Sequence, residues 1–390
     1  MKKQYKKIFN EIKNNILKVA LNNKNLHDPN FDNKESLIIN KNIKNTFVSS
    51  TGINRKIFEK KISKFVNSKY AICVNSGTEA LKLSLLALNV KYGDEVLVPS
   101  LTFIGSVNAI SYCGASPHFI DVKSNDILLD DIKLLKYLKK ISYLKNGFTY
   151  NKKTKKRISA IIPVHLFGQF ANIISLKKKL KKFNIKILED AAEALGSTYK
   201  NKHFGTFGDI GILSFNGNKI ITTGGGGAII TNNKKYFKKA YRLANIGKII
   251  SPVDLKHDLI GYNSLMPALN ASMGLAQILK INKFIKKKRK LFKLYSESFS
   301  KSKYFQLYKE NKEVRSNYWL QCLIINSKYK KFTHDLIHDL KKKKITTRPI
   351  WHPIHLLKPY KDCFKMNLEN TQEIFKRLIT LPSSVNTNSK

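Results

Sequence analysis

Short apolar runs alternate with amphipathic segments along the middle of the chain. The runs predict buried strands at residues 70–74, 95–98, 118–121, 159–164, 186–190, 210–215 and 227–231. The segments around them, such as the one that carries Phe58, Ile62 and Phe65 at helical spacing, predict helices at residues 58–65, 80–88, 103–112, 130–140 and 173–182. This alternation predicts an α/β fold with an open, mostly parallel sheet that helices cover on both faces. Ligands in such sheets bind at the carboxyl ends of the strands.

The two ends of the chain follow a different pattern. Residues 1–45 are polar and rich in Lys and Asn, and they predict a short helix near residues 5–21 followed by an irregular arm. The polar insert 145–156 predicts an exposed loop, and a long helix is predicted over residues 267–300. We therefore expect an N-terminal helix and arm (1–45), a large domain (46–250) and a small C-terminal α/β domain (251–390).

Composition adds a strong positive charge, formally +46 over 390 residues. Such a charge is typical of proteins that bind nucleic acid or anionic membranes. However, all but seven of the 72 Lys and Arg residues are lysine, and they are spread along the whole chain together with many Asn and Ile residues. Nucleic-acid readers prefer arginine for bidentate contacts, so this pattern favours a coding bias and predicts neither a nucleic-acid nor a membrane partner.

Other bulk features favour a cytoplasmic protein. The chain has no apolar stretch of about 18 residues, which a membrane-spanning helix requires. Its charged N-terminus does not resemble a secretory signal. The four cysteines form no CxxC pair, and a chain of this length needs no disulfide bonds to be stable.

The first candidate for chemistry is Asn75-Ser-Gly-Thr78, a small-residue turn between a predicted strand and helix. Small residues let the backbone approach an oxyanion, and the start of the helix offers free N–H groups. The turn therefore indicates a phosphate site, although an ordinary helix cap has the same residues.

The second candidate, Asp190, follows an apolar strand within Glu189–Glu193. A buried aspartate needs a positive partner, which a protonated pyridine nitrogen would supply. A helix-capping aspartate is the alternative.

The third and sharpest candidate is Lys219, in Ser214-Phe-Asn-Gly-Asn-Lys219, which is followed by the four glycines of Gly224–Gly227. Its sequence neighbours carry no charge, which suits an amine that must attack a carbonyl group. The glycines leave room for a bulky ligand, and a solvated lysine in a glycine loop is the alternative.

In this order and spacing the three segments resemble the DegT/DnrJ/EryC1/StrS family of sugar aminotransferases, over about residues 45–384. Within it, the legionaminic acid and bacillosamine subgroup is the most similar. The family resemblance implies the fold of fold-type I pyridoxal-phosphate enzymes, with a mostly parallel seven-stranded sheet. It also implies pyridoxal 5′-phosphate as cofactor and a homodimer with shared sites.

The resemblance also implies a role for each site residue. Lys219 would hold the cofactor covalently and move a proton, and Asp190 would pair with the ring nitrogen. Phe103 would stack on the ring, and Glu193 would lie near the ring hydroxyl. Three further residues would hold the phosphate within the subunit, and a fourth would reach the cofactor phosphate of the neighbouring subunit: Gly77, Thr78 and Ser214, and Asn263.

Further positions are candidates for substrate binding. They are His165, Asn218, Arg348 and His352. For His165 the alternative is a core histidine, and for Arg348 it is a structural ion pair. The His352-x-x-His355 pair has no third ligand at convincing spacing, so no metal site is predicted. One departure from the family is Leu265, where an arginine is usual.

The resemblance implies transfer of an amino group from L-glutamate to the 4-keto group of a nucleotide-linked sugar. The expected substrate is a UDP- or GDP-linked 2-acetamido-6-deoxy sugar used for surface glycans or nonulosonic acids. A 3-keto or perosamine-type sugar is the alternative substrate.

Overall fold

The computed structural model describes residues 2–20, 23–249 and 256–385. Its centre is a seven-stranded sheet in the order β1-β11-β10-β7-β6-β2-β3. Only β11 runs antiparallel to its neighbours, and the other pairs are parallel. The strands are β1 (Tyr70–Val74), β2 (Glu95–Pro99), β3 (Ser116–Ile120), β6 (Ile158–Ile161), β7 (Lys186–Asp190), β10 (Ile210–Ser214) and β11 (Gly227–Thr231). The predicted α/β class is confirmed.

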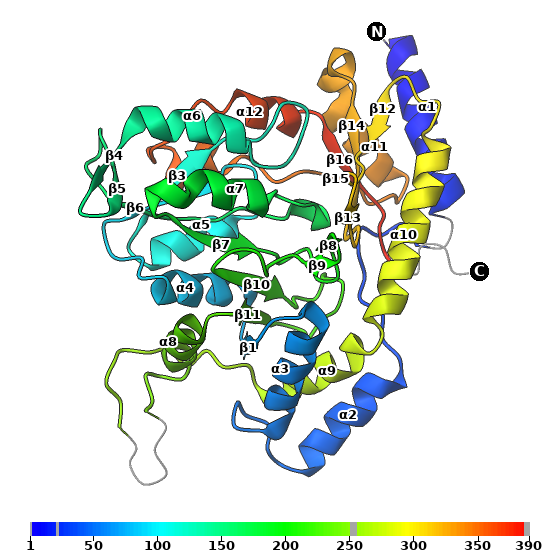
Figure 1. The fold of residues 1–390 in the computed structure, drawn as a ribbon. Helices are drawn as coiled ribbons and strands as arrows, with labels where there is room; N and C mark the ends of the chain where they lie inside the picture. Colours follow the sequence, from blue (N-terminus) through cyan, green and yellow to red (C-terminus); the bar gives the residue numbers. More distant parts are fainter. Residues whose placement is uncertain (1, 21–22, 250–255, 386–390) are drawn as a thin grey trace.

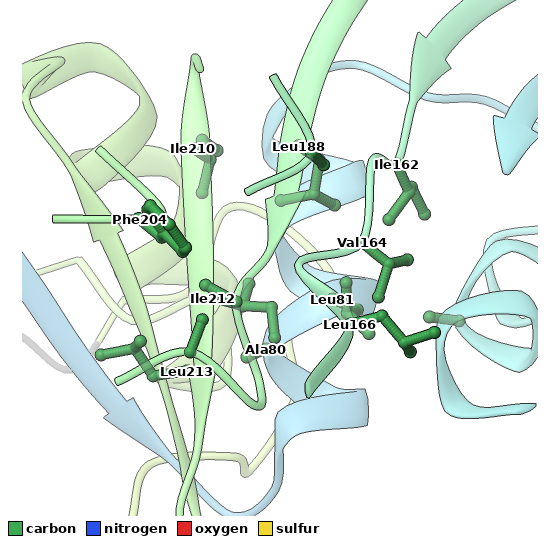
Figure 2. Packing of buried hydrophobic residues seen from close by; sticks show 14 of the residues in the cluster. Ala80, Leu81, Ile162, Val164, Leu166, Leu188, Phe204, Ile210, Ile212 and Leu213 are labelled. Carbon is green, nitrogen blue, oxygen red and sulfur yellow. The ribbon is translucent and has the colours of Figure 1, made fainter. Parts of the chain in front are cut away.

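Helices cover both faces of this sheet (Figure 1). They are α3 (Ile53–Val66), α4 (Gly77–Ala87), α5 (Ile104–Tyr112), α6 (Asp131–Ile141), α7 (Ile173–Leu180), α8 (Lys234–Ala244) and α9 (Ala268–Ile278). Every residue of β2, β10 and β11 is buried, as expected for strands between two helical layers. Figure 2 shows Ala80 and Leu81 of α4 among the side chains of β7 and β10, such as Leu188 and Ile212. This packing fixes the start of α4 against the carboxyl ends of the strands.

A second apolar core joins the two ends of the chain. Its four-stranded antiparallel sheet has the order β12-β14-β16-β15. Ile8, Ile12 and Ile16 of the first helix are buried in this core with residues from 291 to 381. Its elements are α1 (Lys2–Val19), α10 (Ile281–Ser298), α11 (Thr333–Lys342), β12 (Phe305–Leu307), β14 (Gln321–Ile325), β15 (Arg348–Pro349) and β16 (Leu378–Leu381). The N-terminal helix therefore packs with C-terminal elements. The expected domain boundary near residue 250 lies outside the described residues.

The remaining elements lie outside these two groups. They are α2 (Asn33–Lys44), α12 (Glu369–Phe375), β4 (Ser142–Lys145), β5 (Phe148–Asn151), β8 (Thr198–Tyr199), β9 (Lys202–His203) and β13 (Val314–Arg315), with 3-10 turns at 166–168, 181–183, 327–332, 354–356 and 358–360.

Three local predictions were wrong. The arm expected to be irregular contains α2, which starts with a capping box between Asp32 and Glu35. The insert expected to be a loop begins with the hairpin β4–β5, whose Asn146-Gly147 turn has positive φ at both residues. The expected long helix is broken between α9 and α10, where Lys280 pairs with Glu35.

Candidate active site

A cavity of about 350 Å³ lies at the carboxyl ends of the central strands. The segments that follow β1, β2, β7 and β10 each contribute to its wall, which is the usual ligand position in such a sheet. It brings together eight of the predicted site residues: Gly77, Thr78, Phe103, Asp190, Glu193, Ser214, Asn218 and Lys219. The residues that are far apart in sequence therefore converge on one space of ligand size.

The start of α4 forms one end of the cavity. Ser76 caps the helix, and its hydroxyl accepts a hydrogen bond from Glu79 N at 3.0 Å. The first N–H groups of the helix, at Gly77 and Thr78, have no acceptor within the helix. A Cβ at Gly77 would lie 3.2 Å from Ser214 Oγ, so the glycine brings this hydroxyl next to the helix start. Free N–H groups, two hydroxyls and the helix dipole together fit a phosphate.

Glycine is also required at the first residue of β11. A Cβ at Gly227 would lie 2.6 Å from the carbonyl carbon and oxygen of Ser76. Any side chain there would push the start of α4 away from the sheet. The glycine run therefore shapes this end of the cavity through Gly227.

Asp190 is the last residue of β7, and it is buried in the wall of the cavity. Its Oδ2 accepts a hydrogen bond from Ser106 Oγ at 2.6 Å, and its Oδ1 accepts one from Ala192 N at 3.1 Å. These donors fix the carboxylate and leave lone pairs for a further donor, such as a protonated ring nitrogen. Sequence reasoning missed Ser106, because an α5 serine that is 84 residues before its partner gives no local signal.

Lys219 has uncharged neighbours in the sequence, but in the fold it lies beside a carboxylate. Its Nζ is 3.5 Å from Glu193 Oε1 and 4.0 Å from the centre of the Trp319 ring. Only 13% of its side chain is exposed. The sequence around Lys219 gives no sign of this contact, because Glu193 comes from the loop after β7.

Burial raises the pKa of Glu193 to about 7. The nearby ammonium of Lys219 and the N–H of Phe167, which donates to Glu193 Oε2 at 2.8 Å, oppose this rise, and the charge of Asp190 adds to it. A carboxyl group with a pKa near 7 next to an amine can take up or release a proton at neutral pH.

Aromatic rings form the open side of the cavity. Phe103 stands 52% exposed at the start of α5, although a phenyl ring is normally buried. Its ring meets that of Trp351 edge-on, with 6.1 Å between centroids. The exposed ring fits a stacking role for Phe103, and the Trp351 contribution was missed because it comes from the C-terminal part of the chain.

The structure places two of the predicted substrate-binding residues away from the cavity. His165 is fully buried, with its Nε2 2.8 Å from Glu189 Oε2 and its ring stacked on Phe204. It does not line the cavity, so the assignment to substrate binding is corrected to the alternative of a core histidine. His352 is exposed and packs on Phe375 outside the cavity. Its assignment to substrate binding is therefore also corrected, here to a packing residue.

Two other candidates lie at the mouth of the site. Asn218 lines both the main cavity and a smaller adjoining one, and Arg348 lines the smaller one. Asn263 is exposed outside the main cavity, and its backbone oxygen accepts from Asn75 Nδ2 at 3.2 Å. Leu265 is buried in the main core. It therefore does not offer the polar contact to a substrate or second subunit that an arginine at this position could make.

Within the described ranges no cluster of three His, Cys, Asp or Glu residues could hold a metal ion. Over the same residues no helix is long and apolar enough to cross a membrane.

Free N–H groups at a helix start, the buried carboxylate of Asp190 and the largely buried amine of Lys219 meet in one cavity of this fold, as expected for an enzyme that binds pyridoxal phosphate. The model of the DegT/DnrJ/EryC1/StrS aminotransferase family matches residues 29–390. The chain therefore belongs to this family of pyridoxal-phosphate-dependent aminotransferases.

Named relatives cover nearly the whole chain. The chain is 35% identical over 360 residues to the GDP-perosamine synthase of Escherichia coli O157:H7, covering 92% of each. It is 35% identical over 337 residues to that of Vibrio cholerae, covering 86% of each. A chain of Streptococcus pneumoniae assigned as a sugar aminotransferase and solved in its PLP form superposes with a TM-score of 0.82 at 26% identity, covering 92% of this chain and 93% of that one. Helicobacter pylori PseC, an aminotransferase of pseudoaminic acid biosynthesis, has the same fold, with a TM-score of 0.83 at 24% identity and coverage of 93% and 94%.

Proposed function

We propose that the protein transfers an amino group from L-glutamate to the 4-keto group of a nucleotide-linked 6-deoxy sugar. The observation that carries this proposal is the convergence of Lys219, Asp190 and the α4 start on one cavity. The cofactor would supply an electron sink and a carrier for the amino group. The protein would supply its position and the proton transfers.

Each site residue has a defined task in this proposal. Lys219 would hold the cofactor through its Nζ, and the start of α4 with Ser214 would hold the phosphate. Asp190 would pair with the ring nitrogen, where its charge favours the protonated form. Glu193, 3.5 Å from Lys219 Nζ, accepts a proton from this amine and leaves it in the neutral form that attack requires.

The nucleotide-sugar substrate rests on the relatives. Two relatives at 35% identity are GDP-perosamine synthases, whereas a UDP-4-amino-4,6-dideoxy-N-acetyl-beta-L-altrosamine transaminase of Campylobacter jejuni is 29% identical over 336 residues. This favours a GDP-linked, perosamine-type keto sugar over the UDP-linked 2-acetamido sugar. Arg348, at the mouth of the site, would meet the diphosphate of either nucleotide.

The active form in this proposal is a homodimer. Asn263 is exposed, and the surface hollow that it lines also includes Ser76, at the back of the phosphate cradle. From this position its side chain would reach the cofactor phosphate of a second subunit. Sedimentation of the holoenzyme tests the oligomeric state, and a dimer is expected. Asn263→Ala should bind the cofactor more weakly than the wild type.

The experiment that tests the function is a screen of the holoenzyme with L-glutamate against 4-keto-6-deoxy sugars linked to GDP or UDP. Amination of the GDP-linked sugar, with 2-oxoglutarate released in equal amount, is expected. Product NMR identifies the aminated carbon. No 2-oxoglutarate with any keto sugar would contradict the proposal.

A further inference from the structure

A second cavity, of about 190 Å³, adjoins the first. The two share Asn218, Trp319 and Trp351 in their walls. The second cavity is also lined by Arg348 of β15 and by His27, which lies between α1 and α2. A ligand that is bound next to Lys219 and extends past Trp319 therefore enters the space that faces His27.

His27 has no hydrogen-bond partner among the described residues. Both of its ring nitrogens are buried and unpaired. Its ring lies tilted near Trp319, with 6.5 Å between the ring centroids. Buried polar groups are nearly always hydrogen-bonded, so a buried imidazole with two unpaired nitrogens beside a cavity indicates a missing ligand.

The chain around His27 is held in place without help from its ring. Before it, Leu26 O accepts a hydrogen bond from Ser383 N at 2.8 Å. After it, Asp28 N donates to Ser384 Oγ at 2.7 Å. The backbone on both sides is thus anchored to the C-terminal segment, and the fold presents the imidazole to the cavity at a fixed position. The segment matched by the family model begins at residue 29, after His27.

The charge around His27 indicates which groups it can bind. Burial lowers the pKa of His27 well below its ordinary value, and the nearby amino groups of Lys288 and Lys219 act in the same direction. A neutral imidazole offers one donor and one acceptor. This suits a hydroxyl or an acylamino group, whereas the exposed guanidinium of Arg348 suits the phosphates further out.

We propose that His27 is a substrate-binding residue whose imidazole hydrogen-bonds a hydroxyl or acylamino substituent of the keto sugar. This inference rests on the proposed function. The sugar lies between Lys219 and Arg348, against the rings of Trp319 and Trp351. Leu26 and His27, which precede α2, complete the wall of the site. A hydroxyl at this position corresponds to the GDP-linked substrate, and an acylamino group to the UDP-linked one.

The test compares three variants of the holoenzyme. His27→Phe keeps a flat ring and removes both hydrogen bonds, while His27→Gln keeps one donor and one acceptor. His352→Phe is the matched control, because His352 is exposed and packs on Phe375 outside both cavities. For each variant, the half-reaction with glutamate is followed by the cofactor absorbance, and KM is measured for the keto sugar.

We expect His27→Phe to raise KM for the keto sugar roughly tenfold, as for the loss of one or two hydrogen bonds. The half-reaction with glutamate stays within about twofold of the wild type, because the cofactor contacts do not change. His27→Gln recovers part of the affinity, and His352→Phe behaves as the wild type. Whichever nucleotide sugar shows the KM change identifies the substituent that His27 contacts.

Thermal unfolding separates a binding role from a structural one. An apolar ring in place of an unpaired buried imidazole leaves the melting temperature of the free holoenzyme unchanged or higher. The stabilisation by saturating nucleotide sugar is smaller in His27→Phe than in the wild type. An unchanged KM for the keto sugar in His27→Phe overturns this inference and leaves the proposed function standing, whether or not the melting temperature falls. A wild-type enzyme that aminates no keto sugar overturns both this inference and the proposed function.

Discussion

The hydroxyl of Ser106 is expected to control how tightly the protein binds its cofactor. Ser106 Oγ donates to Asp190 Oδ2 at 2.6 Å, and both side chains are buried. A hydrogen bond to a charged group contributes about 1.5–3 kcal/mol. Ser106→Ala leaves this carboxylate with one fewer donor and less fixed in orientation. The dissociation constant for pyridoxal phosphate should therefore rise by roughly 10- to 150-fold.

The assay is a titration of the cofactor-free protein, followed by absorbance or by quenching of tryptophan fluorescence. Ser84→Ala is the matched control: Ser84 lies on the neighbouring helix α4 and is fully buried, and its hydroxyl has no hydrogen-bond partner among the described residues. This control removes a hydroxyl of the same size without the loss of a hydrogen bond, so its affinity should equal that of the wild type. A Ser106→Ala protein within about twofold of the wild type would refute the role assigned to the Ser106 hydroxyl.

Three further predictions concern the pH response, a core residue and a glycine. The pKa of Glu193 is about 7 in the folded protein against an ordinary 4.5, so the folded state holds this proton more tightly than the unfolded state. The unfolding free energy of the cofactor-free protein should thus fall by up to about 3 kcal/mol as pH rises from 4.5 through 7, and Glu193→Gln should abolish this slope in denaturant titrations; a slope that persists in the variant would exclude Glu193 as its source. His165→Ala should cost about 2–4 kcal/mol in urea unfolding because it empties a buried, hydrogen-bonded site, with KM unchanged; a raised KM at full stability would restore His165 to the substrate site. Gly227→Ala should weaken cofactor binding at least tenfold, because its Cβ would lie 2.6 Å from Ser76, whereas Gly217→Ala, whose nearest contact would be 3.9 Å, should bind normally; equal affinities would show that the start of α4 tolerates the shift.

The parts of the molecule that could be predicted from sequence are those with a local signal. Five-residue apolar runs such as Tyr70–Val74 became strands because they are buried between two helical layers. Gly77, Asp190 and Lys219 could be identified because each follows or lies near such a run, and parallel strands bring their carboxyl ends together.

The interactions that were missed depend on contacts between distant segments. Glu193 and Lys219 are 26 residues apart, and no spacing rule joins them. His165 has the same position at a strand end as a site residue, but its ring points to Glu189 in the core. In contrast, the Asn146-Gly147 hairpin and the Asp32–Glu35 cap have local signals that composition obscured, since both lie in segments rich in lysine and asparagine.

In the proposed function a single amine, that of Lys219, holds the cofactor. Borohydride reduction of the holoenzyme, followed by proteolysis and mass spectrometry of the labelled peptides, identifies this amine. We expect the cofactor label on the Lys219 peptide alone and no label on Lys219→Ala. A label on other lysines, or an equally labelled Lys219→Ala protein, would contradict it.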